Sequence, residues 1–98
     1  MKQLQKEIHK TAVRSGWWDN PRSPLEIHML IVSEIAEATE AARKAVGNSQ
    51  LEEAKELADA VIRIMDYCEY LGWDLEGLIK TKHEFNKTRP YRHGGKKY

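Results

Sequence analysis

The chain has 98 residues, of which 41% are hydrophobic and 32% charged, and its formal net charge is +1. This composition is typical of one soluble globular domain, residues 1–98, and excludes a disordered chain. The first ten residues are too polar for a signal peptide, and the longest aliphatic run, residues 29–32, is too short to span a bilayer. We therefore expect a cytoplasmic protein.

The small net charge conceals two oppositely charged regions. Residues 25–76 hold twelve acidic and four basic side chains, whereas residues 77–98 hold seven Lys or Arg and a single acidic residue. Such asymmetry is typical either of a basic tail that binds nucleic acid or of an acidic site and a basic arm that meet around one ligand. Composition alone leaves both interpretations open.

The pattern predicts a first helix over residues 2–15, which ends at Gly16, because glycine tolerates the left-handed conformation common after a helix. A second helix is predicted to start after Ser23. Pro24 suits its first position, and Glu26 completes a capping box with Ser23. This helix is expected to reach residue 46.

A third helix is predicted from a second capping box, formed by Ser49 and Glu52, to Leu71 before Gly72. Asp74 can cap a fourth helix that reaches Thr88, since Pro90 forbids its continuation. Residues 90–98 are expected to form a basic C-terminal arm. No strand alternation is present, so the sequence predicts an all-α, four-helix-bundle-type fold with short connections.

The second helix is apolar on every side, since eight of the twelve residues from 27 to 38 are apolar. A helix of this kind is expected to be buried. Glu34 and Glu37 interrupt its apolar surface about 60° apart on one face. A buried carboxylate is costly unless it is protonated, paired or bound to a metal, and two neighbouring carboxylates favour a cation.

The third helix carries a similar pair, Glu56 and Asp59. Taken alone, this pair is typical of a solvated charged face. Antiparallel helices joined by a short turn can nevertheless bring both pairs together, and four carboxylates without a softer donor suit Mg²⁺, or Mn²⁺. No histidine has a glutamate three residues before it, which argues against a di-iron bundle, and one Cys with four scattered His gives little support for zinc.

The fourth helix supplies positive charge. Lys82, Asn86 and Arg89 are spaced so that they fall along one side of a helix, and their ammonium, amide and guanidinium groups match phosphate oxygens. Arg92 and His93 extend this basic surface into the arm. The alternatives are a solvated basic end and a nucleic-acid contact, although no groove-reading motif is present.

Four segments together resemble the MazG-like nucleotide pyrophosphohydrolases of the all-α NTP pyrophosphatase superfamily. They are residues 21–23, 30–38, 56–63 and 82–94, which hold in order the patterns E-x-x-E, E-x-x-D and K-x-x-x-N-x-x-R. The resemblance covers nearly the entire chain. It implies hydrolysis of (deoxy)nucleoside triphosphates to the monophosphate and pyrophosphate, for housekeeping of the nucleotide pool, with a bundle completed in a homodimer or homotetramer.

The resemblance also implies roles for individual residues. The four acidic residues Glu34, Glu37, Glu56 and Asp59 would bind Mg²⁺, and the Lys, Asn and Arg of the fourth helix would approach the phosphates. One departure is Ser33, where many members carry another acidic residue.

Among the carboxylates, we expect Glu37 to be the base for the attacking water. Trp17 and Trp18 either stack on the nucleobase or anchor their loop by packing. Specialised dUTP, dCTP or phosphoribosyl-ATP hydrolysis remains an alternative, as does a non-catalytic helical interaction module with the same fold.

Overall fold

The computed structural model describes residues 1–44 and 47–91. These residues form four α-helices and no strand, which confirms the predicted all-α class. None of the helices within this part is long and apolar enough to cross a membrane. The helices are α1 (Lys2–Arg14), α2 (Pro24–Lys44), α3 (Ser49–Leu71) and α4 (Leu75–Lys87).

Three helix ends follow the predicted signals. Gly16 and Gly72 adopt positive φ angles of 89° and 75°, a conformation that glycine reaches without a steric penalty. At the start of α4, Asp74 accepts a hydrogen bond from the backbone N–H of Gly77 at 3.1 Å. Glycine and aspartate therefore set these boundaries by local chemistry alone.

The two predicted capping boxes are not formed as expected. Ser23 Oγ accepts from the backbone N–H of Leu25, but Glu26 pairs with Arg22 at 2.6 Å instead of turning back towards Ser23. Helix α3 begins one residue earlier than predicted, because Asn48 and not Ser49 is its N-cap. Asn48 makes no side-chain capping bond. Its carbonyl accepts the first helical bond, from Glu52 N–H at 2.9 Å.

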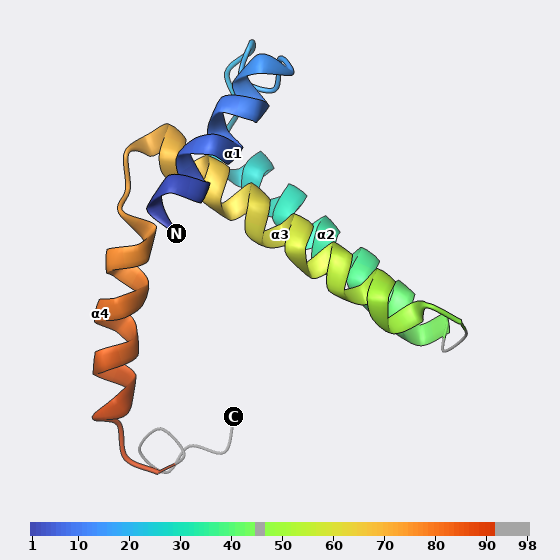
Figure 1. The fold of residues 1–98 in the computed structure, drawn as a ribbon, viewed down its shortest axis with the longest axis vertical. Coiled ribbons are helices and arrows are strands. Elements are labelled where there is room, and N and C mark those ends of the chain that lie inside the picture. Colours follow the sequence, from blue (N-terminus) through green and yellow to red (C-terminus); the bar gives the residue numbers. More distant parts are fainter. Residues whose placement is uncertain (45–46, 92–98) are drawn as a thin grey trace.

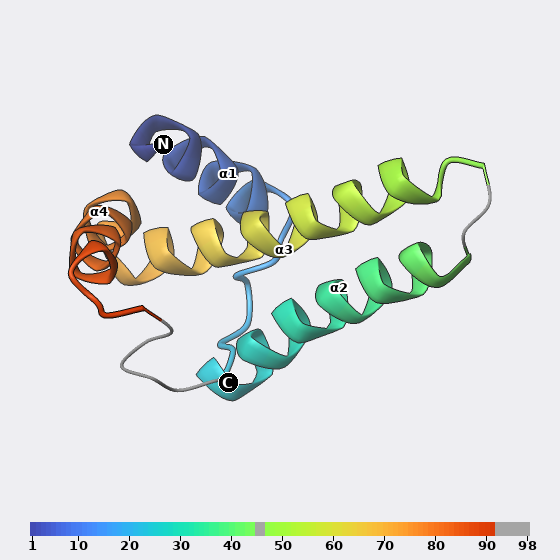
Figure 2. The same cartoon turned by 90° about the horizontal axis from the view of Figure 1, so that it is seen from below.

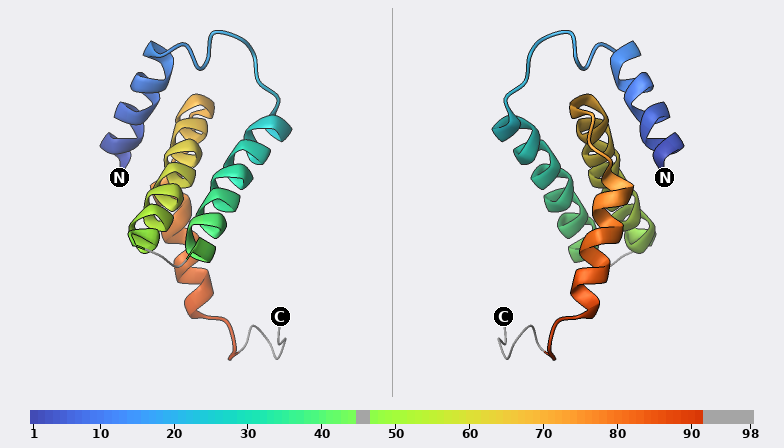
Figure 3. Two further views of the ribbon diagram at one scale, coloured as in Figure 1. Left: turned by 90° about the vertical axis from the view of Figure 1, so that its right-hand side faces the viewer. Right: turned by 90° about the vertical axis from the view of Figure 1, so that its left-hand side faces the viewer.

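The helices are arranged around α3. Figure 2 shows α2 running antiparallel beside α3, with α1 on another side of α3 near its C-terminal end. Among the described residues, the α2–α3 pair makes the most extensive helix contact, followed by the α1–α3 pair. Beyond α3 the chain turns at Gly72, and α4 extends away from the other three helices (Figures 1 and 3). Within one chain, the four described helices therefore do not close a four-helix bundle.

Polar contacts fix α1 and the following loop to α3. The buried Gln5 donates to the Glu69 carboxylate at 3.0 Å and to the Trp73 carbonyl at 3.1 Å. Asp66, also buried, lies 2.7 Å from His9 Nδ1 and accepts a hydrogen bond from the indole of Trp18. Since these groups come from three separate segments, they determine where α1 lies.

The apolar core is small and consists mainly of short side chains. Cys68 is buried, and this burial raises the pKa of its thiol. The short side chains allow α2 and α3 to approach closely. The buried apolar residues are Ile27, Ala38, Ala41, Ala60, Met65 and Cys68.

The expectation that α2 is buried on every side is wrong for the single chain. Leu25, Met29 and Val32 are 73%, 61% and 52% exposed. At 100° per residue they lie opposite Glu34 and Ala38, which face α3. The physical reason is that α3 covers one side of α2, and nothing else in the described part of the chain covers the other.

Candidate metal centre

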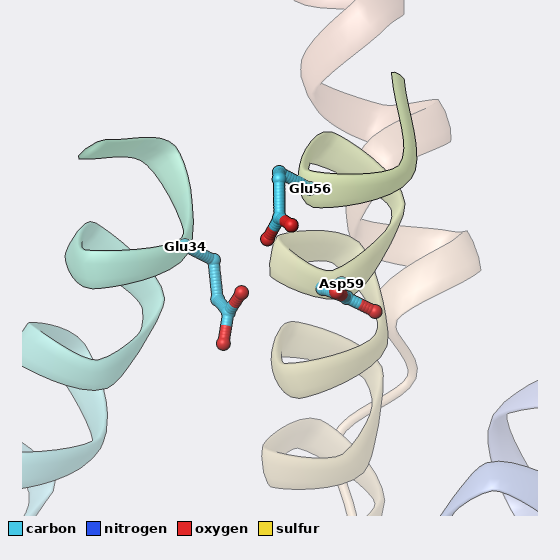
Figure 4. A group of neighbouring side chains, drawn as sticks. All are labelled: Glu34, Glu56 and Asp59. Carbon is cyan, nitrogen blue, oxygen red and sulfur yellow. The ribbon is translucent and has the colours of Figure 1, made fainter. Parts of the chain in front are cut away.

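Three of the four predicted carboxylates come together between α2 and α3. One carboxylate oxygen from each of Glu34, Glu56 and Asp59 can be chosen so that all lie within 4.8 Å of one another. Figure 4 shows Glu34 reaching from α2 towards the two side chains on α3. Glu34 is only 8% exposed, while Glu56 is half-buried and Asp59 is exposed. The group is thus anchored in the helix interface and open on one side.

The burial of Glu34 follows from its neighbours on α2. Ile27, Ala38 and Ala41 lie on the same side of the helix and are buried against α3, where Ala60 is 2% exposed. These residues place the Glu34 carboxylate in an apolar interface, as the spacing predicts. A carboxylate in such a place needs a positive partner.

Glu37 does not belong to this group, and its predicted place on a buried face is wrong. Its side chain is exposed, because it lies one turn further along α2 and about 60° around the helix. There it interacts with Glu56 beside a groove of about 420 Å³ near the α2–α3 connection. Glu37 therefore lies next to the three-carboxylate group without joining it.

Crowding of carboxylates changes the acidity of Glu56. A hydrogen bond with Glu37 is the largest cause that raises the pKa of Glu56 to about 7, followed by burial and by the negative charges of Glu37 and Asp59. A hydrogen bond with Glu34 adds to the same effect. The cluster thus holds a proton near neutral pH, and a bound cation would replace it.

This raised pKa predicts a pH dependence of the metal-free protein. In the unfolded chain Glu56 ionises near 4.5, whereas in the folded protein its pKa is about 7. The folded state therefore binds the proton more tightly, so the free energy of unfolding should fall as the pH rises from 4.5 to 7 and level off above 7. Urea unfolding at a series of pH values measures this slope. Glu56→Gln should flatten it, and an unchanged slope in that variant would contradict the assignment.

Arg63 is a member of the site that the sequence analysis missed. Its Nε donates to Glu34 Oε1 at 2.9 Å, and its guanidinium lies 4.8 Å from the ring centre of Trp17. Arg63 follows Asp59 by four residues and Glu56 by seven, which places all three along one side of α3. That spacing was the signal that could have identified it.

A cleft of about 650 Å³ opens beside the carboxylates. Trp17 borders it and also contacts the guanidinium of Arg22, at 3.8 Å from the ring centre. The cleft is built by α1, the loop after it, α2 and α3, so it unites segments that are distant in the sequence. Its lining residues are Leu4, Glu7, Ile8, Thr11, Ala12, Ser15, Trp17, Glu34, Asp59, Ile62, Arg63 and Asp66.

The two tryptophans have different surroundings. Trp18 is absent from the cleft lining and stacks on Tyr70, with ring centres 3.9 Å apart and planes inclined by 5°. Its indole N–H donates to Asp66. Trp18 is therefore a packing anchor, whereas Trp17 lies where a ligand in the cleft would contact it.

The predicted phosphate-binding residues lie on α4 and directly after it. Lys82 and Arg89 both approach the ring of Phe85, at 5.6 and 5.3 Å from its centre. Asn86 lies on the same helix, which extends away from α2 and α3 (Figure 1). The structure thus does not bring these side chains to the cluster within one chain. The remaining predicted contacts, Arg92 and His93, fall outside the described residues.

Comparison with known proteins adds nothing to this geometry. Neither the protein-family models, nor the curated proteins, nor the solved structures include a match to this chain.

Proposed function

We propose that this protein is a Mg²⁺-dependent nucleoside triphosphate pyrophosphohydrolase, which converts a (d)NTP and water into the monophosphate and pyrophosphate. The observation that carries the proposal is the three-carboxylate group of Glu34, Glu56 and Asp59 at the side of a 650 Å³ cleft. Ligand sites for small molecules commonly have volumes of about 300–1,000 Å³. The resemblance of the acidic and basic motifs, in their order, to those of the MazG-like pyrophosphohydrolases supports the same reaction.

The donor set fits a hard divalent cation. Carboxylate oxygens are the ligands that Mg²⁺ and Mn²⁺ prefer, and neither Cys nor His contributes to this group of described residues. When bound, Mg²⁺ would neutralise phosphate charge and make water a better nucleophile. Glu34, Glu56 and Asp59 are the residues that would hold it.

The proposal also gives roles to other residues near the carboxylates. Glu37, beside Glu56 and exposed, is the base that takes a proton from the attacking water. Trp17 borders the cleft and offers its ring to the nucleobase. Attack of the water oxygen on the α-phosphorus breaks the bond to the bridging oxygen, and pyrophosphate leaves.

A second copy of the chain completes this site in our proposal. The exposed face of α2, with Leu25, Met29 and Val32, is the kind of apolar surface that a helix buries in a bundle. Pairing of two chains across this face would bury it and close the bundle. Within that assembly we assign Lys82, Asn86 and Arg89 to the phosphates, since α4 extends away from the carboxylates of its own chain.

This assembly predicts a measurable oligomer. Light scattering after gel filtration should give the mass of a dimer or tetramer for the wild-type protein. Val32→Glu should shift the mass to that of a monomer, because a charge cannot be buried in an apolar interface without a large cost. Lys55→Glu, on an exposed part of α3, is the control and should leave the mass unchanged. A monomeric wild-type protein would refute the proposed assembly.

The activity is tested with a nucleotide panel. Ribo- and deoxynucleoside triphosphates, including dUTP and dCTP, together with phosphoribosyl-ATP, are incubated with the protein and Mg²⁺ or Mn²⁺, and pyrophosphate is measured. We expect release that depends on the metal and on at least one of these substrates. If no nucleotide releases pyrophosphate while Mg²⁺ still raises the melting temperature, the fold serves a non-catalytic interaction and the enzymatic proposal is wrong.

A further inference from the structure

Arg63 already occupies a position at the most buried carboxylate of the site. Its Nε lies 2.9 Å from Glu34 Oε1, and the side chain of Arg63 is 29% exposed and that of Glu34 11% exposed. An arginine remains protonated at any ordinary pH, so this contact is an ion pair. Glu34 is therefore neutralised by the protein's own cation when no metal is bound.

Arg63 also stands out within the cleft. Four acidic residues line it, and Arg63 is the one basic residue among the lining side chains in the described part of the chain. Its guanidinium also lies 4.8 Å from the ring centre of Trp17, a contact that does not involve Glu34. Among the described side chains that line the cleft, a polyanionic ligand would find no other positive group to contact.

We propose that Arg63 is an exchangeable counter-cation: it neutralises Glu34 in the metal-free protein, yields this carboxylate to a divalent cation, and then binds an anionic phosphate group in the cleft. This inference rests on the proposed function, because it assumes that Glu34 is a metal ligand and that the cleft holds a nucleotide. It assigns a task to a residue outside the four acidic positions and the basic α4.

The exchange follows from charge and distance. A divalent cation held by Glu34 would share this carboxylate with the Arg63 guanidinium, and two cations at one carboxylate repel each other strongly outside bulk water. The guanidinium therefore has to move before Glu34 becomes a full ligand. Its planar fork is well suited to grip phosphate oxygens at its new position.

The first test measures binding of Mg²⁺ alone, by calorimetry at pH 8, without nucleotide. Arg63→Gln removes the competing cation, so the dissociation constant for Mg²⁺ should fall roughly tenfold, the effect of losing one charge-assisted hydrogen bond. The matched control is Arg22→Gln. Arg22 also contacts the ring of Trp17, but it pairs with Glu26 and not with Glu34. This variant should leave Mg²⁺ affinity unchanged.

A second measurement uses the wild-type protein and so does not depend on the folding of a variant. In a ¹⁵N-labelled sample, the Nε–H resonance of Arg63 should move during a Mg²⁺ titration and saturate at the same concentration as the calorimetric signal. The corresponding resonance of Arg22 should remain in place. A stationary Arg63 signal during saturable Mg²⁺ binding would overturn the exchange.

A third measurement follows the nucleotide. At saturating Mg²⁺, Arg63→Gln should raise KM for the best substrate about tenfold and change kcat less, because a ground-state phosphate contact is lost. Unchanged KM would overturn the phosphate role.

These outcomes separate the inference from the proposed function. Absence of Mg²⁺ binding in the wild-type protein would refute both together. Normal Mg²⁺-dependent turnover with equal Mg²⁺ affinity in the wild-type protein and in Arg63→Gln would leave the enzyme intact and refute the exchange alone.

Discussion

Replacing Glu34 by Gln is expected to lower kcat for pyrophosphate release by roughly 10³-fold, because a neutral amide oxygen is a much weaker ligand for Mg²⁺ than a carboxylate. Glu34 is the most buried of the three clustered carboxylates and the one that α2 contributes. Its loss would leave both remaining carboxylates of the proposed metal site on α3. Steady-state kinetics over a range of Mg²⁺ concentrations measure the effect.

The same variant should remain folded. The amide oxygen of Gln can still accept the hydrogen bond that Arg63 now donates to Glu34, and the side-chain volume is nearly unchanged. Glu26→Gln is the matched control on the same helix, since Glu26 pairs with Arg22 away from the cluster. Full activity in Glu34→Gln would remove Glu34 from the metal ligands and with it the main support for the proposed reaction.

Much of the fold could be predicted from local signals. Gly16, Gly72 and Asp74 end or begin helices through their own backbone and side-chain chemistry, which requires no knowledge of distant contacts. The start of α3 was misplaced, because Asn48 already supplies the first helical carbonyl. Errors of one residue at a helix end are expected where the cap makes no side-chain bond.

The candidate site was predictable to the extent that helix periodicity determines it. Glu34 shares a side of α2 with small and apolar residues, and it is buried as this pattern indicates. Periodicity does not say how deep a helix interface extends, so Glu37, 60° away, was wrongly placed on the buried surface. The ion pair between Glu34 and Arg63 depends on how α2 and α3 align, which no single-helix pattern contains.

The cleft and the course of α4 depend on tertiary contacts. α1 lies beside the carboxylates because Gln5 and His9 contact Glu69 and Asp66, more than fifty residues later in the chain. In the sequence these four residues are ordinary polar positions on two helices. α4 could be recognised as a helix from its cap and spacing, but its direction is set by the turn at Gly72.

Asp66 is expected to matter most for stability, since one buried carboxylate joins three segments. It lies 2.7 Å from His9 Nδ1, and the indole N–H of Trp18 lies 3.0 and 3.1 Å from its two oxygens. Asp66→Ala leaves both ring N–H groups without this acceptor and should lower the free energy of unfolding by about 3 kcal/mol. Urea unfolding at a fixed protein concentration measures the loss. Glu84→Ala, an exposed residue paired with Lys87, should cost less than about 0.5 kcal/mol.

A double-mutant cycle separates the hydrogen bond from simple packing. Trp18→Phe keeps an aromatic ring against Tyr70 but removes the N–H, and alone it should cost about 1–2 kcal/mol because the Asp66 carboxylate loses a donor. In the Asp66→Ala background the hydrogen bond no longer exists, so the same change should cost about 1 kcal/mol less. Strictly additive losses would show that Asp66 and Trp18 stabilise the protein independently, and that the loop after α1 is held by the stacking of Trp18 on Tyr70 rather than by this hydrogen bond.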